Sequence, residues 1–133
     1  MASIFTKIIN REIPAHIVAE NDEFLAFLDI NPLAEGHTLV IPKVEVDYLF
    51  DLDDEVLSKI MVFSKGVAKA IESVIDCERI GVSVIGLEVP HAHVHLIPMN
   101  SIDDMNFTRL KLSLSPEELA ATAKQINETY KKG

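Results

Sequence analysis

Hydrophobic and polar residues alternate over several short stretches of the chain, a pattern typical of β-strands. In residues 24–30 successive side chains would face opposite sides of a sheet, because side chains alternate along a strand. One face would carry Phe24, Ala26 and Leu28, and the other Leu25 and Phe27. The stretches expected as strands are residues 16–20, 24–30, 37–41, 79–85 and 89–98. Short turns between the first two and between the last two predict hairpins.

The spacing of apolar residues becomes helical in three places. These are residues 4–9, residues 53–75 and a segment that begins at Ser115. Ser3 can cap the first helix, while Ser115, Pro116 and Glu118 together have the pattern of a capping box with proline at the first helical position. Residues 99–114 show no clean period and are expected to be loop. The sum is an α+β fold with about five antiparallel strands, one long helix and a C-terminal helix.

A chain of 133 residues is long enough for one core, so residues 1–133 are expected to form a single domain, with helix 115–131 as an appendage. The formal net charge of −9 argues against binding to a nucleic-acid polymer, which needs concentrated positive charge. No apolar run is long enough to span a membrane, and the first residues lack a signal-peptide core, so a cytoplasmic location without membrane contact is expected.

Three of the five histidines lie at alternate positions, His91, His93 and His95, within the last predicted strand. On a strand all three imidazoles would share one face. A solvated polar face is the simplest explanation, but histidine at this regular spacing is unusual on a strand. Histidines two apart can chelate a metal ion. An imidazole can also act as a nucleophile beside neighbouring hydrogen-bond donors. Spacing alone leaves these last two alternatives open.

The row of histidines resembles the motif of the histidine triad (HIT) family, in which histidines alternate with apolar residues on a strand. The resemblance extends beyond this motif and keeps the family's order over roughly residues 3–99. Its other parts are Ile4-Phe5, Lys7-Ile8-Ile9, Glu12-Ile13-Pro14-Ala15, Phe27-Leu28-Asp29-Ile30-Asn31-Pro32 and Gly36-His37-Thr38-Leu39-Val40-Ile41-Pro42-Lys43.

This resemblance implies a HIT-like fold and a nucleotide hydrolase of the phosphoramidase or dinucleotide hydrolase type. His93 would be the nucleophile on an α-phosphorus and would form a nucleotidyl-histidine intermediate. His95 and His37 would contact phosphate oxygens, and His91 would fix the orientation of the catalytic strand. Asp29 would bind the ribose hydroxyls. The base pocket would be walled by Ile4, Phe5, Ile8, Phe27 and Ile30.

Imidazole suits this chemistry because it is a strong nucleophile that is mostly neutral at pH 7 when its pKa is near 6.5. A protonated neighbouring histidine could stabilise phosphate charge or supply a proton to the leaving group. The resemblance therefore implies a purine nucleotide substrate, no cofactor and no metal. It also implies a homodimer joined through sheet edges.

The chain departs from the family pattern just before the triad. An asparagine common near Val84 is missing, and so is a longer loop with glycine and glutamine. Glu88 stands where many relatives have a small hydroxyl residue, and Val44 and Glu45 replace a common histidine. A carboxylate beside a phosphate is repelled, so Glu88 is a candidate for acting on the leaving group or recognising an amine there. A solvated turn residue is the alternative.

Three other functions remain open at this point. A nucleotidyl transferase would use the same intermediate with an acceptor other than water. A nucleotide-binding regulatory protein would show only incidental turnover. A metal-binding protein would use His91, His93 and His95 as ligands.

Overall fold

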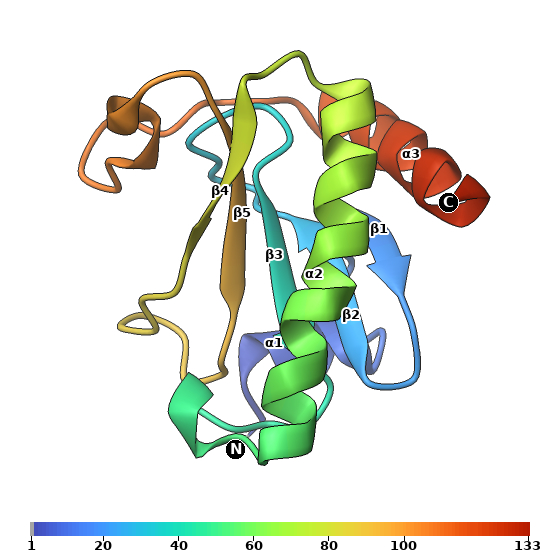
Figure 1. Ribbon diagram of the computed structural model, residues 1–133, viewed down its shortest axis with the longest axis vertical. Coiled ribbons are helices and arrows are strands. Elements are labelled where there is room, and N and C mark those ends of the chain that lie inside the picture. The colour runs from blue at the N-terminus through green and yellow to red at the C-terminus, as the bar shows by residue number, and fades with distance from the viewer. Residues whose placement is uncertain (1) are drawn as a thin grey trace.

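The computed structural model describes residues 2–133 and shows a five-stranded antiparallel sheet with helices on both faces (Figure 1). The strands are β1 (Ile17–Glu20), β2 (Phe24–Leu28), β3 (Thr38–Pro42), β4 (Arg79–Ser83) and β5 (Val94–Met99). They are ordered β1-β2-β3-β5-β4, so that the last strand of the chain lies between β3 and β4. The predicted α+β class is confirmed.

Three α-helices and two short 3₁₀ helices complete the fold. They are α1 (Ile4–Ile9), η1 (Leu49–Asp51), α2 (Asp54–Val74), η2 (Ile102–Met105) and α3 (Pro116–Lys132). In Figure 1, α2 crosses in front of the sheet and α1 lies behind it. None of the helices in residues 2–133 is both long and apolar enough to cross a membrane.

The sheet separates two hydrophobic clusters, as the alternation in β2 predicts. Phe24, Ala26 and Leu28 join the larger cluster, together with residues of α2 and α3. Leu25 and Phe27 face the other way and pack with Phe5 and Ile8 of α1. Every residue of β2 and β3 is therefore buried.

The C-terminal helix is predicted as an appendage, but in the structure α3 packs against both α2 and β1. It contributes Leu119, Ala123 and Ile126 to the larger cluster. The predicted capping box is formed: the Ser115 hydroxyl accepts from the Glu118 N–H, and the Glu118 carboxylate accepts from the Ser115 N–H.

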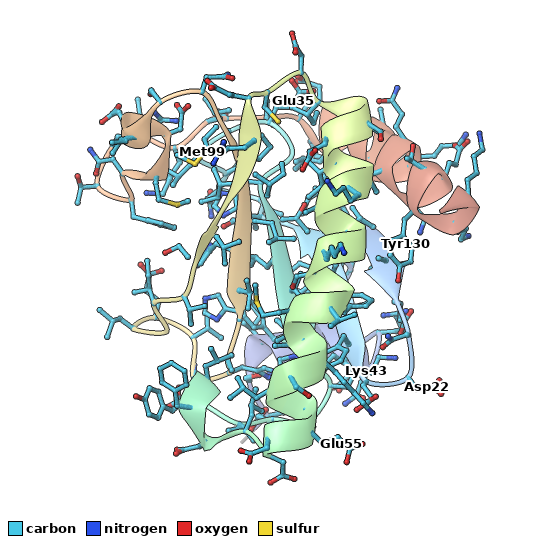
Figure 2. All side chains as sticks on the ribbon, viewed as in Figure 1. Asp22, Glu35, Lys43, Glu55, Met99 and Tyr130 are labelled. Atoms are coloured by element: carbon cyan, nitrogen blue, oxygen red, sulfur yellow. The ribbon has the colours of Figure 1, made fainter. Side chains whose placement is uncertain are left out.

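A glycine in the middle of α2 lies at the contact between α2 and α3. A Cβ added to Gly66 would lie 3.4 Å from the Tyr130 ring, at the lower end of ordinary van der Waals contact. Tyr130 lies beside α2 (Figure 2), where its ring meets Phe63 edge-on at 6.0 Å.

The predicted strand over residues 89–98 is wrong at its start, because β5 begins at Val94. The neighbouring strands do not pair with residues before Val94. The pairing of β3 with β5 ends at Val94, and β4 ends at Ser83, which lies opposite His95. Residues 84–93 form a long irregular connection instead of the expected tight hairpin turn. Consequently His91 and His93 precede the strand, and the three imidazoles do not form one row.

Candidate functional site

A cavity of about 430 Å³ opens on the face of the sheet that α1 covers. Its walls come from segments far apart in sequence: α1, the end of β2, the connection 84–93, the start of β5 and the segment after η2. Of the polar residues expected in the site, His37, His93, His95, Asp29 and Glu88 line it. His91 does not.

The expected nucleophile has one ring nitrogen fixed by the backbone. Nδ1 of His93 lies 2.8 Å from the carbonyl oxygen of His91. A carbonyl can only accept, so this nitrogen must carry the proton and donate. The lone pair of neutral His93 is then on Nε2. Within residues 2–133, Ser64 Oγ is the only side-chain nitrogen or oxygen that is both fully buried and without a hydrogen bond. His93 Nε2 has no hydrogen-bond partner and is therefore not fully buried, so it is accessible from the cavity that His93 lines.

His37 and His95 form a chain of hydrogen bonds with a defined direction. The N–H of Leu33 donates to His37 Nδ1 at 3.0 Å, which places the His37 proton on Nε2. His37 Nε2 then donates to His95 Nδ1, also at 3.0 Å. His95 must carry its own proton on Nε2, the nitrogen left for the cavity. The ring centroids of His93 and His95 are 5.0 Å apart. The neutral Nε2–H of His95 could therefore donate to a phosphate group that lies beside His93.

Burial keeps these two imidazoles uncharged. It lowers the pKa of His37 to about 3, and the neighbouring His95 and Lys111 add to the effect. Burial also lowers the pKa of His95 to about 4, with a further contribution from His93. Both side chains are thus neutral at pH 7 and act as hydrogen-bond donors. The sequence allowed a protonated histidine beside the nucleophile, but desolvation makes the neutral form of both side chains the stable one.

His91 is completely buried outside the cavity, and both of its ring nitrogens are occupied. Nε2 donates to the carbonyl oxygen of Pro42 at 2.8 Å. Nδ1 accepts from the Ser3 hydroxyl, also at 2.8 Å. Glu45 in turn accepts from the N–H of Ser3 and the hydroxyl of Thr6. These contacts tie α1 to the residue whose carbonyl holds His93, and they leave His91 no nitrogen for a metal.

Asp29 follows β2 and is partly buried at the cavity wall, with its side chain 22% exposed. Oδ1 accepts from the N–H of Asn31 at 2.9 Å, whereas Oδ2 is 3.7 Å from His37 Nε2, too far for a hydrogen bond. Because His37 is neutral at pH 7, this approach is not an ion pair. Burial is the main influence on Asp29 and raises its pKa. Oδ2 remains available as an acceptor.

All of the apolar residues expected around a base line the cavity. They are Ile4, Phe5, Ile8, Phe27 and Ile30. Ile4 and Ile30 are half or more exposed, which is unusual for large aliphatic side chains that only fill a core. The Phe5 ring also meets His93 edge-on at 5.1 Å, so the wall continues directly into the histidine cluster.

Two residues of the cavity lie in the segment that the sequence predicts only as loop. The Phe107 ring packs edge-on against His95 at 4.8 Å, and Lys111 lies beside it at the cavity wall. Neither belongs to a periodic pattern or to the motifs of the resemblance. The connection 84–93 adds Ile85, Leu87 and Val89, which no motif in the sequence marks as site residues.

One group of side chains in residues 2–133 could hold a metal ion. Asp29, His37 and His95 each have a ligand atom within 4.8 Å of the others. This group differs from the three histidines proposed from the sequence, since it contains only one of them. An ion there would replace the hydrogen bond between His37 and His95.

Comparisons with known proteins show the family of the chain. A family model described as "HIT domain" matches residues 10–102. An uncharacterized HIT-like protein from Borreliella burgdorferi is 39% identical over 132 residues, covering 93% of this chain and 95% of that protein. The adenosine 5'-monophosphoramidase of Schizosaccharomyces pombe is 36% identical over 134 residues, covering 98% of this chain and all of the relative (100%). A crystal structure of a Hit-like protein from Bartonella henselae matches with a TM-score of 0.82 and 34% identity, over 96% of this chain and 95% of the other.

Proposed function

Because the chain belongs to the HIT family, we propose that it hydrolyses nucleoside 5'-phosphoramidates or dinucleoside polyphosphates through a nucleotidyl-histidine intermediate on His93. The observation that carries this proposal is the hydrogen bond from His93 Nδ1 to the His91 carbonyl, which leaves the Nε2 lone pair to the cavity. Relatives named adenosine 5'-monophosphoramidase, from two yeasts, support the phosphoramidate class and a purine base.

In the first step the Nε2 lone pair attacks the α-phosphorus of the substrate. The bond from phosphorus to the leaving nitrogen or oxygen breaks, and its electron pair departs with the leaving group, which takes up a proton from solvent. Water then attacks the phosphorus and returns one proton to solvent, the electron pair of the bond from phosphorus to Nε2 goes back to Nε2, and the nucleoside monophosphate leaves. One water is consumed, and His93 returns to its neutral form.

The neighbouring side chains would bind and orient the nucleotide. His95 Nε2–H, held in place by His37, would donate to a phosphate oxygen as charge develops there. Asp29 Oδ2 would accept from a ribose hydroxyl. His91 would act as a positioning residue, since it reaches His93 only through its carbonyl group.

Glu88 lies in the cavity wall, and its charge raises the pKa of Asp29 as a minor contribution after burial. A carboxylate in this place would attract a protonated amine and repel a further phosphate. We expect Glu88→Gln to slow turnover of a phosphoramidate with a cationic amine more than that of a dinucleoside triphosphate. Equal effects on the two substrates would mean that Glu88 does not recognise the leaving group and is only a solvated residue of the cavity wall.

The covalent intermediate is tested by mass spectrometry after rapid quenching of a mixture with adenosine 5'-phosphoramidate. The intact protein should become heavier by one adenylyl group, and peptide mapping should place that group on His93. His93→Ala should give no adduct, whereas His16→Ala, whose side chain lies outside the cavity, should react as the wild type does. An adduct that persists in His93→Ala would contradict the proposal.

The remaining alternatives give different results in the same assay. A transferase would pass the adenylyl group to an added amine faster than to water. Activity abolished by a chelator and restored by zinc would favour the group of Asp29, His37 and His95 as a metal site. Tight binding of adenosine 5'-monophosphate without turnover would favour a regulatory protein.

We also propose that the protein is a homodimer. β4 is an edge strand, and its exposed apolar residues Val82, Val84 and Ile85 continue into the following connection. An unprotected edge of this kind is suited to pairing with a second copy. The cytoplasmic location remains a prediction from the sequence.

A further inference from the structure

Lys111 presents an ammonium group at the cavity wall in a fixed position. Its Nζ donates to the carbonyl oxygens of Phe107 and Arg109 within the same segment. A lysine ammonium has three N–H groups, so one donor remains after these two hydrogen bonds. The side chain is partly buried and lines the cavity together with Phe107.

The segment that carries Lys111 is tied to the loop between β2 and β3. Arg109 donates to the carbonyl oxygen of Leu33 at 2.7 Å, and the N–H of Leu112 donates to the carbonyl oxygen of Pro32 at 2.8 Å. The N–H of Leu33 is the donor to His37 Nδ1. Hydrogen bonds of the residues before and after Lys111 therefore fix its position relative to His37 and His95.

The charges around the cavity are unbalanced without this residue. Among the lining residues Lys111 is the only lysine or arginine, whereas Asp29 and Glu88 are acidic. His37 and His95 are neutral at pH 7, with pKa values of about 3 and 4. The whole chain carries a net charge of −9, so its general field does not attract anions. A nucleotide phosphate would thus meet two carboxylates and one fixed positive charge.

We propose that Lys111 is a phosphate-binding residue, whose free Nζ–H and positive charge contact a phosphate oxygen of the bound nucleotide. The proposal deepens the proposed function, because it takes a nucleotide as the ligand of the same cavity. Lysine binds phosphate as a point charge, and a hydrogen bond between charged partners is stronger than a neutral one. Lys111 therefore distinguishes a nucleotide from its uncharged nucleoside.

The test compares binding of adenosine 5'-monophosphate with binding of adenosine by isothermal titration calorimetry. Lys111→Gln removes the charge but keeps an N–H donor for the carbonyl tethers. We expect it to weaken binding of the monophosphate by about ten- to a hundredfold and to leave adenosine binding within about twofold. Lys111→Arg should recover most of the loss. Lys65→Gln, on the exposed surface of α2, is the matched control and should bind both ligands as the wild type does.

Salt dependence provides a second measurement. Wild-type affinity for the monophosphate should fall as salt rises, and Lys111→Gln should show a weaker dependence. Unchanged affinity for the monophosphate in Lys111→Gln would overturn the proposal. An equal loss for both ligands would also overturn it, because that result would mean a disturbed segment and not a lost charge.

The binding test of Lys111 and the adduct test of His93 can fail independently of each other. If no adduct forms on His93 but monophosphate binding depends on Lys111, the hydrolase proposal fails and the Lys111 proposal stands. If the adduct forms normally and Lys111→Gln binds the monophosphate as the wild type does, the Lys111 proposal fails and the hydrolase proposal stands. A wild-type protein that binds neither ligand would overturn both.

Discussion

At the scale of single residues, backbone groups determine the proton position on each imidazole around the cavity. The His91 carbonyl fixes Nδ1–H on His93, and the Leu33 N–H fixes the opposite tautomer on His37. His95 then follows His37. A nucleophile and a hydrogen-bond donor of the same residue type thus lie side by side, with the Nε2 lone pair of His93 and the Nε2–H of His95 both directed to the cavity.

The neutral state of His37 and His95 predicts a loss of stability in mild acid. Below a pKa near 6.5 the unfolded chain binds protons on these side chains, whereas the folded chain does not until pH approaches 4 or 3. Between pH 7.5 and 5.5 each imidazole should therefore lower the free energy of unfolding by about 1.4 kcal/mol. Urea unfolding at both pH values measures this.

His37→Asn provides the comparison for that measurement, since asparagine can accept from the Leu33 N–H but does not titrate in this range. The variant should lose about 1.4 kcal/mol less than the wild type over the same pH interval. Above pH 7.5 neither protein should respond to pH through these groups. An identical slope in the two proteins would show that His37 is not held neutral.

At the scale of elements, the α-helices α1 and α3 both begin with a serine cap but differ in what the cap supports. Ser3 caps α1 by accepting from the Thr6 N–H and also donates to His91. Ser115 caps α3 with Glu118 and contacts no residue of the cavity. The first cap therefore links a helix end to the histidine cluster, while the second only stabilises its helix.

Replacing each cap separates these roles. Ser115→Ala should lower the free energy of unfolding by about 1 kcal/mol and leave kcat unchanged. Ser3→Ala should cost about 2 kcal/mol, because it also removes the nearer donor of buried His91 Nδ1 and leaves only the longer contact with the Thr6 hydroxyl at 3.4 Å. It should in addition lower kcat, with a smaller effect on KM, since His91 positions His93. Thermal unfolding and steady-state kinetics measure both, and equal kcat values for the two variants would contradict the link.

At the scale of the whole molecule, the strand order leaves β1 and β4 as the sheet edges. The β1 edge is close to α3, where Asn127 donates to the Val18 carbonyl at 2.9 Å. Within residues 2–133 no further strand pairs with the outer side of β4, and Val82 is 49% exposed. The unprotected edge therefore lies on the side next to the triad strand, so a second copy joined there would lie near the histidines of the first.

Introducing a charge at this edge should separate a dimer. Val82→Lys places a lysine on the strand, a device that natural proteins use to block edge pairing. Sedimentation equilibrium should show a dimer for the wild type and a monomer for the variant. Ile102→Lys, at an exposed position of η2, should remain dimeric. A monomeric wild type would show that β4 is not an interface.

The sequence by itself determined what depends on neighbours along the chain. Alternation placed the two faces of β2 correctly, helical spacing located α2, and the serine pattern located the start of α3. The resemblance selected His37, Asp29 and the apolar wall as site residues, and all of them line the cavity. These features can be read locally because strand and helix periodicity, and helix capping, involve residues only a few positions apart.

The tertiary structure decided what depends on contacts between distant segments. It broke the expected row of three histidines, because the ladder that would have kept them on one face ends at Val94. It brought Phe107 and Lys111 to the site from a segment without any period. It also made His37 and His95 neutral, since burial depends on what packs around a side chain. Pairing partners, desolvation and the meeting of remote loops are properties of the folded chain, and no local pattern encodes them.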